Sequence, residues 1–406
     1  MPRLQFKSGE RIFLPGGSGT CRSVASELLR TADVRITTSF VPGVNTVVPS
    51  DIGPRTLVSG FFMFPSLSDC HRLGTYRHLP MSYSTITRWL GEQRPFDTCV
   101  VQISRPRADG RASLGPAAEF TPSVLERARR IIAVVNHRVP FVENAPSLAW
   151  RKSIETIETD EPLISYGAGQ IDGVSARVAG QAASFIKDGV VLQLGIGKVP
   201  SALSSLLCDR RGLRLHSGML SDGVMQLAKS GSLDPDWPHL TTMFLGSEKL
   251  YEWIAGHTGI RLSGCEQTHD PRRLAALERF VAVNSALSVD LFGQCNLETA
   301  SGRALSGSGG APDFARAAHL SPGGISIVAL PSTTGPSQVS RIVSTLGRAG
   351  IVTLSRTEAD IVVTDEGVAD LRGLSVAERA DALIAVAHPD ARPRLSEEWR
   401  EIADKL

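Results

Sequence analysis

The stretch Gly189-Val-Val-Leu-Gln-Leu-Gly-Ile-Gly-Lys-Val-Pro-Ser-Ala-Leu-Ser-Ser-Leu-Leu207 predicts the fold class of this protein. An apolar run leads into Gly195-Ile-Gly197, and apolar residues then recur at helical spacing from Val199 onward. This order is typical of a strand, a glycine turn and a helix. Pro200 suits a first helical turn, where its missing N–H costs nothing. Which ligand, if any, the glycine turn binds is a separate question.

Two familiar phosphate-binding loops fit this turn poorly. A Walker loop requires Ser or Thr after its lysine, and here Val199 follows Lys198. A Rossmann loop requires a third glycine and an acidic residue after the second strand, but that strand leads into His216-Ser-Gly218. A tight turn without any ligand stays open as an alternative.

The same unit occurs near the start of the chain. Residues 11–29 again read as a strand, a glycine turn and a helix, with Gly17 and Gly19 in the places of Gly195 and Gly197. Strand-like segments follow both helices, at residues 34–40 and 213–217. Two related α/β halves are therefore expected.

Other segments complete this reading of the chain. Residues 155–168 read as a connection, broken by Asp160-Glu-Pro162, so the domain boundary is placed near residue 167. The expected domains are residues 1–167 and 168–406. Ser375 and Glu378 form a capping box for a helix that follows. Further strands are expected at residues 98–104, 131–135, 280–283 and 325–330, and further helices at 122–130 and 172–187.

Composition excludes several classes of protein. The chain has 406 residues, of which 42% are apolar, so it can form a large core. The net charge of +2 argues against a dedicated nucleic-acid binder. No apolar run approaches the ~20 residues that span a bilayer, and the first residues lack a signal peptide's apolar segment. The six cysteines are scattered, which favours a reducing cytoplasm over disulfides or a metal site.

Five segments, read together, resemble the acetyl-CoA hydrolase/transferase family, whose members include 4-hydroxybutyrate and succinyl-CoA:acetate CoA-transferases. They occur in the family's order along nearly the whole chain. The resemblance implies two related α/β domains with open sheets, like class I CoA-transferases and NagB/RpiA proteins, with the active site between them. The segments are Leu192-Gln-Leu-Gly-Ile-Gly-Lys-Val-Pro200, Gly246-Ser-Glu-Lys-Leu-Tyr251, Asn284-Ser-Ala-Leu-Ser-Val-Asp-Leu-Phe-Gly-Gln294, Gly307-Ser-Gly-Gly-Ala-Pro-Asp-Phe314, and Thr364-Asp-Glu-Gly-Val-Ala-Asp-Leu-Arg-Gly373 with Ala387-His-Pro-Asp390.

The resemblance also implies a chemistry and a nucleophile. Such enzymes move coenzyme A (CoA) between carboxylic acids through a glutamyl anhydride and an enzyme–CoA thioester. In this family the glutamate precedes an N-D-P or N-N-P turn, and Glu266 stands at that spacing before Asp270-Pro271. A solvated loop glutamate is the alternative for Glu266. Cys265, Glu298 and Glu248 are the other nucleophiles considered, although Glu298 could instead only shape the site.

Glycines are the candidates for binding CoA or a developing oxyanion, because a glycine allows close approach to the backbone N–H groups. For each of them, turn geometry alone is an equally good explanation. Lys198 and Arg372 are weaker candidates for the CoA phosphates, and Asp313 and Asp370 could be capping residues. The candidate glycines are Gly195, Gly197, Gly307, Gly309, Gly310 and Gly367.

The expected function is that of an acyl-CoA:carboxylate CoA-transferase in the cytoplasm, with an acyl-CoA and a small carboxylic acid as substrates. No tightly bound cofactor, metal, nucleic acid or membrane is expected, and a homodimer or higher homo-oligomer is the default. An acyl-CoA hydrolase, a CoA-binding paralogue without turnover and a dehydrogenase are the alternatives. His216-Ser-Gly-Met219 departs from the family's H-T-E-M string, which leaves the acyl group undetermined.

Overall fold

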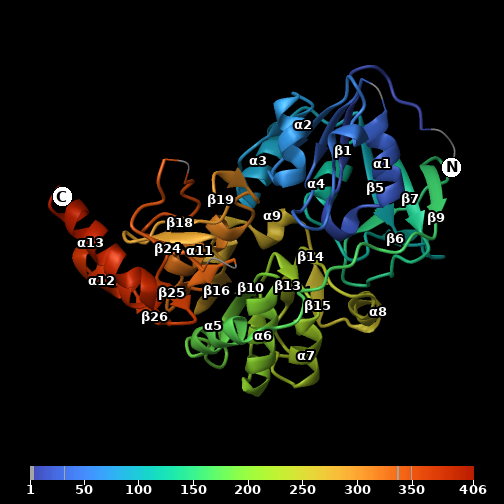
Figure 1. Ribbon diagram of the computed structural model, residues 1–406. Coiled ribbons are helices and arrows are strands. Elements are labelled where there is room, and N and C mark those ends of the chain that lie inside the picture. Colours follow the sequence, from blue (N-terminus) through green and yellow to red (C-terminus); the bar gives the residue numbers. More distant parts are fainter. Residues whose placement is uncertain (1–3, 32, 336–337, 349) are drawn as a thin grey trace.

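The computed structural model describes residues 4–31, 33–335, 338–348 and 350–406, and it contains two large sheets in separate halves of the molecule (Figure 1). The first sheet has seven strands, all parallel to their neighbours. In spatial order these are β4 (Tyr76–His78), β3 (Leu57–Gly60), β2 (Arg35–Thr38), β1 (Arg11–Leu14), β5 (Thr98–Ile103), β7 (Arg130–Asn136) and β9 (Glu155–Thr159).

The second sheet has six strands, of which only the last runs antiparallel. Its central strands β16, β21 and β25 are mostly apolar and almost entirely buried, as expected of parallel strands that are covered on both faces. In spatial order these are β11 (Arg214–Leu215), β10 (Val191–Leu194), β16 (Phe280–Asn284), β21 (Ile325–Ala329), β25 (Ile361–Thr364) and β26 (Gly367–Asp370).

Amphipathic helices cover the sheets. For example, α1 buries Val24, Ala25, Leu28 and Leu29 beneath an exposed polar face. The helices of the first half are α1 (Arg22–Arg30), α2 (Ser68–Arg72), α3 (Tyr83–Glu92) and α4 (Thr121–Leu125). Those of the second half are α5 (Gly173–Ala183), α6 (Lys198–Leu206), α7 (Gly223–Lys229), α8 (Glu248–Gly256), α9 (Cys265–Thr268), α10 (Pro271–Ala275), α11 (Ala311–Leu320), α12 (Val376–Ala385) and α13 (Arg392–Ala403).

The repeated unit predicted from the sequence is present in both halves. β1, its glycine turn, α1 and β2 correspond to β10, its glycine turn, α6 and β11. In each half, the chain first adds one or more strands on one side of β1 or β10 and then crosses over to pair with its other side. As a result, β1 lies between β2 and β5, and β10 lies between β11 and β16. Ligands of open α/β sheets bind outside the carboxyl ends of the strands at such a reversal. Both glycine turns stand at these ends.

Short strands between β11 and β16 join the two halves. The Ala118 N–H donates to the Thr242 carbonyl (2.9 Å) and the Phe244 N–H to the Pro116 carbonyl (2.7 Å). Figure 1 shows α9 between the two halves. The short strands of the chain are β6 (Arg111–Ser113), β8 (Ser147–Ala149), β12 (Met219–Leu220), β13 (His239–Thr241), β14 (Met243–Phe244), β15 (Ile260–Leu262), β17 (Ser288–Asp290), β18 (Cys295–Asn296), β19 (Thr299–Ala300), β20 (Arg303–Ala304), β22 (Thr333–Thr334), β23 (Val339–Ser340) and β24 (Ile342–Val343).

Two local expectations are wrong. The segment 155–168 is not only a connection, because β9 adds an edge strand in which Ile157 alone is fully buried. The helix expected at residues 122–130 ends at Leu125, because the Arg129 N–H donates to the Phe96 carbonyl and Arg130 already pairs with Thr98. The other expected strands and helices are confirmed to within a few residues, although β11 keeps only two residues of the segment 213–217.

The predicted boundary near residue 167 falls between β9 and α5, in a segment without helix or strand. Across the described part of the chain, no helix is both long and apolar enough to cross a lipid bilayer.

Candidate active site between the two halves

The short helix α9 holds Glu266 where the two halves meet. Cys265, one residue earlier, is buried in the core of the first half, whereas Glu266 is only partly buried. The Ser123 hydroxyl of α4 donates to Glu266 Oε2 at 3.1 Å. The carboxylate is therefore oriented by a residue of the other half of the molecule.

Glu266 borders a cavity of about 520 Å³ between α3 and the α9–α10 segment. A second cavity of about 300 Å³ continues along α3 toward α11 and shares Ser84, Thr85 and Pro271 with the first. These volumes are in the range of small-molecule sites. The first cavity is lined by Ser84, Thr85, Thr87, Arg88, Cys265, Glu266, His269, Asp270, Pro271 and Arg272.

The Gly307–Gly310 loop lies against the start of α3 and leads directly into α11. The Tyr83 N–H donates to the Gly309 carbonyl (3.1 Å), and the Ser308 hydroxyl donates to the Met81 carbonyl (3.1 Å). A β-carbon at Gly307 would lie 2.5 Å from the Phe61 carbonyl oxygen, so this glycine permits the packing of the loop itself. Because the first N–H groups of a helix have no partner within it, the start of α11 is a source of hydrogen-bond donors.

His269, directly after α9, fills the space between this loop and α9. Its ring packs against Tyr83 and Phe314, with centroids 4.8 and 4.6 Å away. β-Carbons placed at Gly218 and Gly310 would lie 3.1 and 2.4 Å from His269 Nε2. Burial lowers the pKa of His269 to about 3, so the imidazole is neutral at physiological pH. No sequence motif indicates His269; the glycine at position 218, where a side chain would crowd the imidazole ring, is its only signal.

Both glycine turns lie next to an apolar cluster around Met243 at the boundary. Ile196 packs in an apolar cluster with Val44 of the first half and Met219 of the second. A β-carbon at Gly17 would lie 2.4 Å from the Met243 methyl group, so this glycine allows the halves to approach. Gly197, the residue before α6, has φ +115°. The Ser217 hydroxyl donates to the Leu194 carbonyl beside Gly195. This links the second turn to the segment before Gly218.

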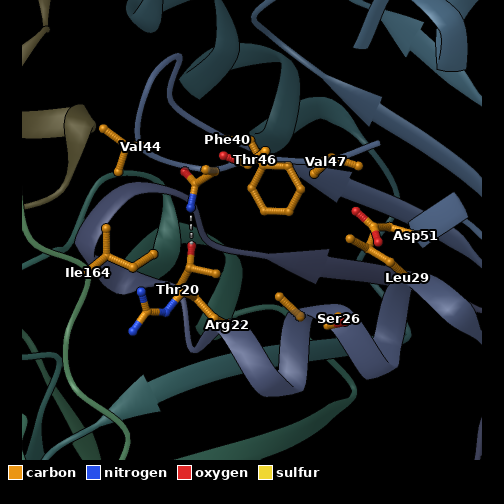
Figure 2. Close-up of a pocket in the computed structure, with 12 residues that line it drawn as sticks. Thr20, Arg22, Ser26, Leu29, Phe40, Val44, Thr46, Val47, Asp51 and Ile164 are labelled. Carbon is orange, nitrogen blue, oxygen red and sulfur yellow. Dashed lines mark hydrogen bonds between the residues drawn. The ribbon is translucent and has the colours of Figure 1, made fainter. Parts of the chain in front are cut away.

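A separate cavity of about 330 Å³ lies beside the first glycine turn (Figure 2). Four of its polar side chains have partners within the protein: Thr20, Arg22, Asn45 and Asp51. Asn45 donates to Thr20 Oγ1 (3.3 Å) and accepts from the Gly17 and Val41 N–H groups, while Arg22 pairs with Glu161 (3.1 Å). None of the candidate residues lines this cavity.

Comparison with known proteins gives the family of the chain. The N-terminal domain of the acetyl-CoA hydrolase/transferase family matches residues 4–161, and its C-terminal domain matches residues 246–399. The 4-hydroxybutyrate coenzyme A transferase of Clostridium kluyveri is 34% identical over 82% of this chain and 79% of its own length. The chain belongs to the acetyl-CoA hydrolase/transferase family.

Solved structures give the same result for the fold. RipA from Yersinia pestis superposes with a TM-score of 0.90 at 26% identity, over 98% of this chain and 95% of RipA. A 4-hydroxybutyrate CoA-transferase from Porphyromonas gingivalis superposes with a TM-score of 0.78 at 30% identity, over 97% of this chain and 94% of that enzyme. The α/β fold with two open sheets is thus the fold of solved relatives.

The alternative nucleophiles are less well placed than Glu266. Burial raises the pKa of the Cys265 thiol well above its ordinary value, so it is a poor source of thiolate. Glu298 is buried and accepts from the Thr353 hydroxyl at 2.9 Å, and its carbonyl accepts from the N–H groups of Leu305 and Ser306 at the start of the glycine loop. Glu248 is exposed on α8, beside Arg138.

The remaining sequence candidates are engaged with neighbouring residues. Lys198 pairs with Asp172 (2.9 Å), and Arg372 pairs with Asp370 (2.6 Å). Gly367 begins β26, at the same edge of the second sheet as Gly195, but three strands lie between β26 and β10. A β-carbon at Gly367 would meet Val386 at 3.6 Å. It does not line the Glu266 cavity.

Asp313 is a capping residue, but for a different helix from its own. It accepts hydrogen bonds from the Ser84 N–H and from the hydroxyls of Ser82 and Ser84 at the start of α3. The glycine loop and α3 are thereby fixed to each other.

Proposed function

We propose that this protein is an acyl-CoA:carboxylate CoA-transferase with Glu266 as its covalent nucleophile. The observation that carries the proposal is the position of this carboxylate, which lies on a cavity between the two halves and is hydrogen-bonded to Ser123. Family membership supports the reaction class, since named relatives are CoA-transferases.

The first step forms an anhydride. A Glu266 carboxylate oxygen attacks the thioester carbonyl of the acyl-CoA, and the carbon–sulfur bond breaks to release CoA thiolate. The tetrahedral intermediate carries an oxyanion, which requires nearby N–H donors. The Gly307–Gly310 loop at the start of α11 is the source we propose for these donors, with the Gly195–Gly197 turn as a further contributor.

The second step stores CoA on the enzyme. The thiolate attacks the glutamyl carbonyl of the anhydride, the first acid leaves as a carboxylate, and Glu266 becomes a thioester of CoA. An incoming carboxylate then reverses both steps and leaves as the new acyl-CoA. No proton is consumed overall, and Glu266 is regenerated.

The Glu266–CoA thioester is directly testable. Incubation with a panel of acyl-CoAs without an acceptor acid should attach CoA at Glu266, and borohydride should reduce the thioester to an alcohol. Peptide mapping should place this change between residues 262 and 272. Glu266→Ala should abolish exchange, and Glu266→Asp should lose ~100-fold, because shortening the side chain misplaces the nucleophile by about 1 Å.

Glu248→Ala is the matched control, because this carboxylate is exposed and lies on a different helix. It should exchange at the wild-type rate. Full exchange by Glu266→Ala, or a label on Cys265 or Glu298, would overturn the assignment.

An acyl-CoA hydrolase is the second candidate, favoured by the family's hydrolase members. It would use the same glutamyl intermediate, with water in place of the acceptor acid. CoA release that is independent of any added carboxylate would identify it.

A further inference from the structure

Glu119 is a buried carboxyl group at the boundary between the halves, to which the reaction above assigns no role. It lies between β6 and α4 and is 2% exposed. Its backbone has φ +41°, a conformation that is uncommon for residues other than glycine. Such conformations persist only where surrounding contacts hold them, and they are concentrated at functional sites.

The backbone of Glu119 positions α9. Its carbonyl accepts from the Cys265 N–H at 2.8 Å, directly before Glu266, and its N–H donates to the Thr242 carbonyl at 3.3 Å. It also forms a parallel bridge with Gly264. The segment that carries the proposed nucleophile is thus hydrogen-bonded on one side to Glu119.

The side chain of Glu119 positions the other wall of the cavity. Oε2 accepts from the Ser39 hydroxyl at 2.7 Å, and Oε1 accepts from the Tyr83 hydroxyl at 3.2 Å. Tyr83 is the first residue of α3, and its N–H donates to the Gly309 carbonyl. One residue therefore connects α9, α3 and the glycine loop.

We infer that Glu119 is a positioning residue which, as a carboxylate, holds Glu266 and the Gly307–Gly310 loop in the geometry that the transfer requires. The inference rests on the proposed function. As a carboxylate, Glu119 accepts from both hydroxyls at once. After protonation one of its oxygens becomes a hydroxyl, which is a donor and a weaker acceptor, so the hydrogen bond that the Ser39 or Tyr83 hydroxyl donates to that oxygen is weakened or reversed.

The Glu119 carboxyl takes up this proton within a pH range in which the enzyme can be assayed. Burial raises the pKa of Glu119 to about 7, while the hydrogen bonds from Ser39 and Tyr83 act in the opposite direction. The facing titratable groups are the Tyr83 phenol of α3 and the Cys265 thiol of α9, and the Glu266 carboxylate belongs to the next residue along α9. Burial raises the pKa of both Tyr83 and Cys265 well above their ordinary values, so both are neutral near pH 7. Ser39, in the loop after β2, and Thr242, between β13 and β14, contribute only hydroxyls at these positions.

Glu119→Gln tests the inference, because it keeps the shape of the side chain but cannot ionise. Wild-type kcat should fall below about pH 7 with the slope of one proton. The variant should lack this pH dependence and have a kcat ~10- to 100-fold lower at pH 8, with KM within about twofold, since small misplacements of reacting groups reduce turnover at this scale. Wild-type kcat and an unchanged pH profile in the variant would overturn the inference.

Glu10→Gln is the matched control. Glu10 is also a buried carboxylate, bonded to the Thr98 hydroxyl (2.5 Å), but it lies at the amino end of the first sheet, away from the cavity. This variant should keep the wild-type kcat and pH profile. A loss equal to that of Glu119→Gln would show that removing any buried carboxylate has this effect, and it would also overturn the inference.

A second readout does not require turnover. Hydrogen exchange in peptides covering residues 264–269 and 306–310, corrected for intrinsic rates, should change near pH 7 in the wild type and in Glu10→Gln but not in Glu119→Gln. If wild-type protein transfers no CoA, the proposed function fails, yet this comparison still decides whether Glu119 controls both segments. Identical exchange in all three proteins would contradict that control.

Discussion

At the scale of single residues, the site depends on how closely Gly310 and His269 approach each other. A β-carbon at Gly310 would lie 2.4 Å from His269 Nε2, although the backbone there has an ordinary φ of −90°. Gly310→Ala therefore tests steric packing without adding backbone strain. We expect it to lower the free energy of unfolding by about 1–3 kcal/mol, as overpacking does, measured by urea denaturation.

Two further variants make this prediction specific. His269→Ala introduced into Gly310→Ala should recover part of the lost stability, because it removes the atom that clashes. Gly180→Ala, in α5 with no atom within 4 Å of the new β-carbon, should be neutral or slightly stabilising. Additive effects of Gly310→Ala and His269→Ala would contradict the predicted contact.

At the scale of elements, α3 depends on a cap from the opposite half. Asp313 of α11 accepts three hydrogen bonds from Ser82 and Ser84. Asp313→Ala should lower the free energy of unfolding by about 1–2 kcal/mol, the cost of losing a helix cap. Exchange should also slow, because α3 positions Gly309 through Tyr83.

Ser375→Ala is the control for this prediction. Ser375 caps α12 through the Glu378 N–H, far along the chain from the cavity residues. Its loss should cost a comparable free energy of unfolding without changing the exchange rate. If Asp313→Ala lowered only stability and left exchange at the wild-type rate, the coupling of α3 to the glycine loop would be wrong.

At the scale of the whole molecule, burial between the halves makes stability depend on pH. Glu119 has its pKa raised from the ordinary 4.5 to about 7, so the folded state binds this proton more tightly than the unfolded state. Its contribution to stability is fully present below about pH 4.5 and is lost as pH rises through 7. The melting temperature of the wild type minus that of Glu119→Gln should therefore decrease between pH 5 and pH 8 in thermal denaturation. A difference that is constant across this range would contradict the raised pKa.

The sequence by itself determined the features that depend on local patterns. Apolar runs ending in glycine turns predicted β1 and β10 with their helices, and Ser375 with Glu378 predicted the start of α12, because helix periods and caps are set by neighbouring residues. Local motifs also identified the family. The roles of Glu266 and of the glycines stay predictions, as do the domain boundary, the oligomeric state and the cytoplasmic location.

Only the tertiary structure decided which residues meet at the site. Asp313 and Ser82, which it caps, are 231 residues apart, and Ser123 and Glu266 are 143 apart. Neither the neutral His269 between two glycines nor the buried Glu119 between two halves has a local signature. β9 was missed because its polar residues favour a loop, and pairing with β7 makes it a strand. Contacts across such separations depend on how the two sheets pack together, which no local pattern contains.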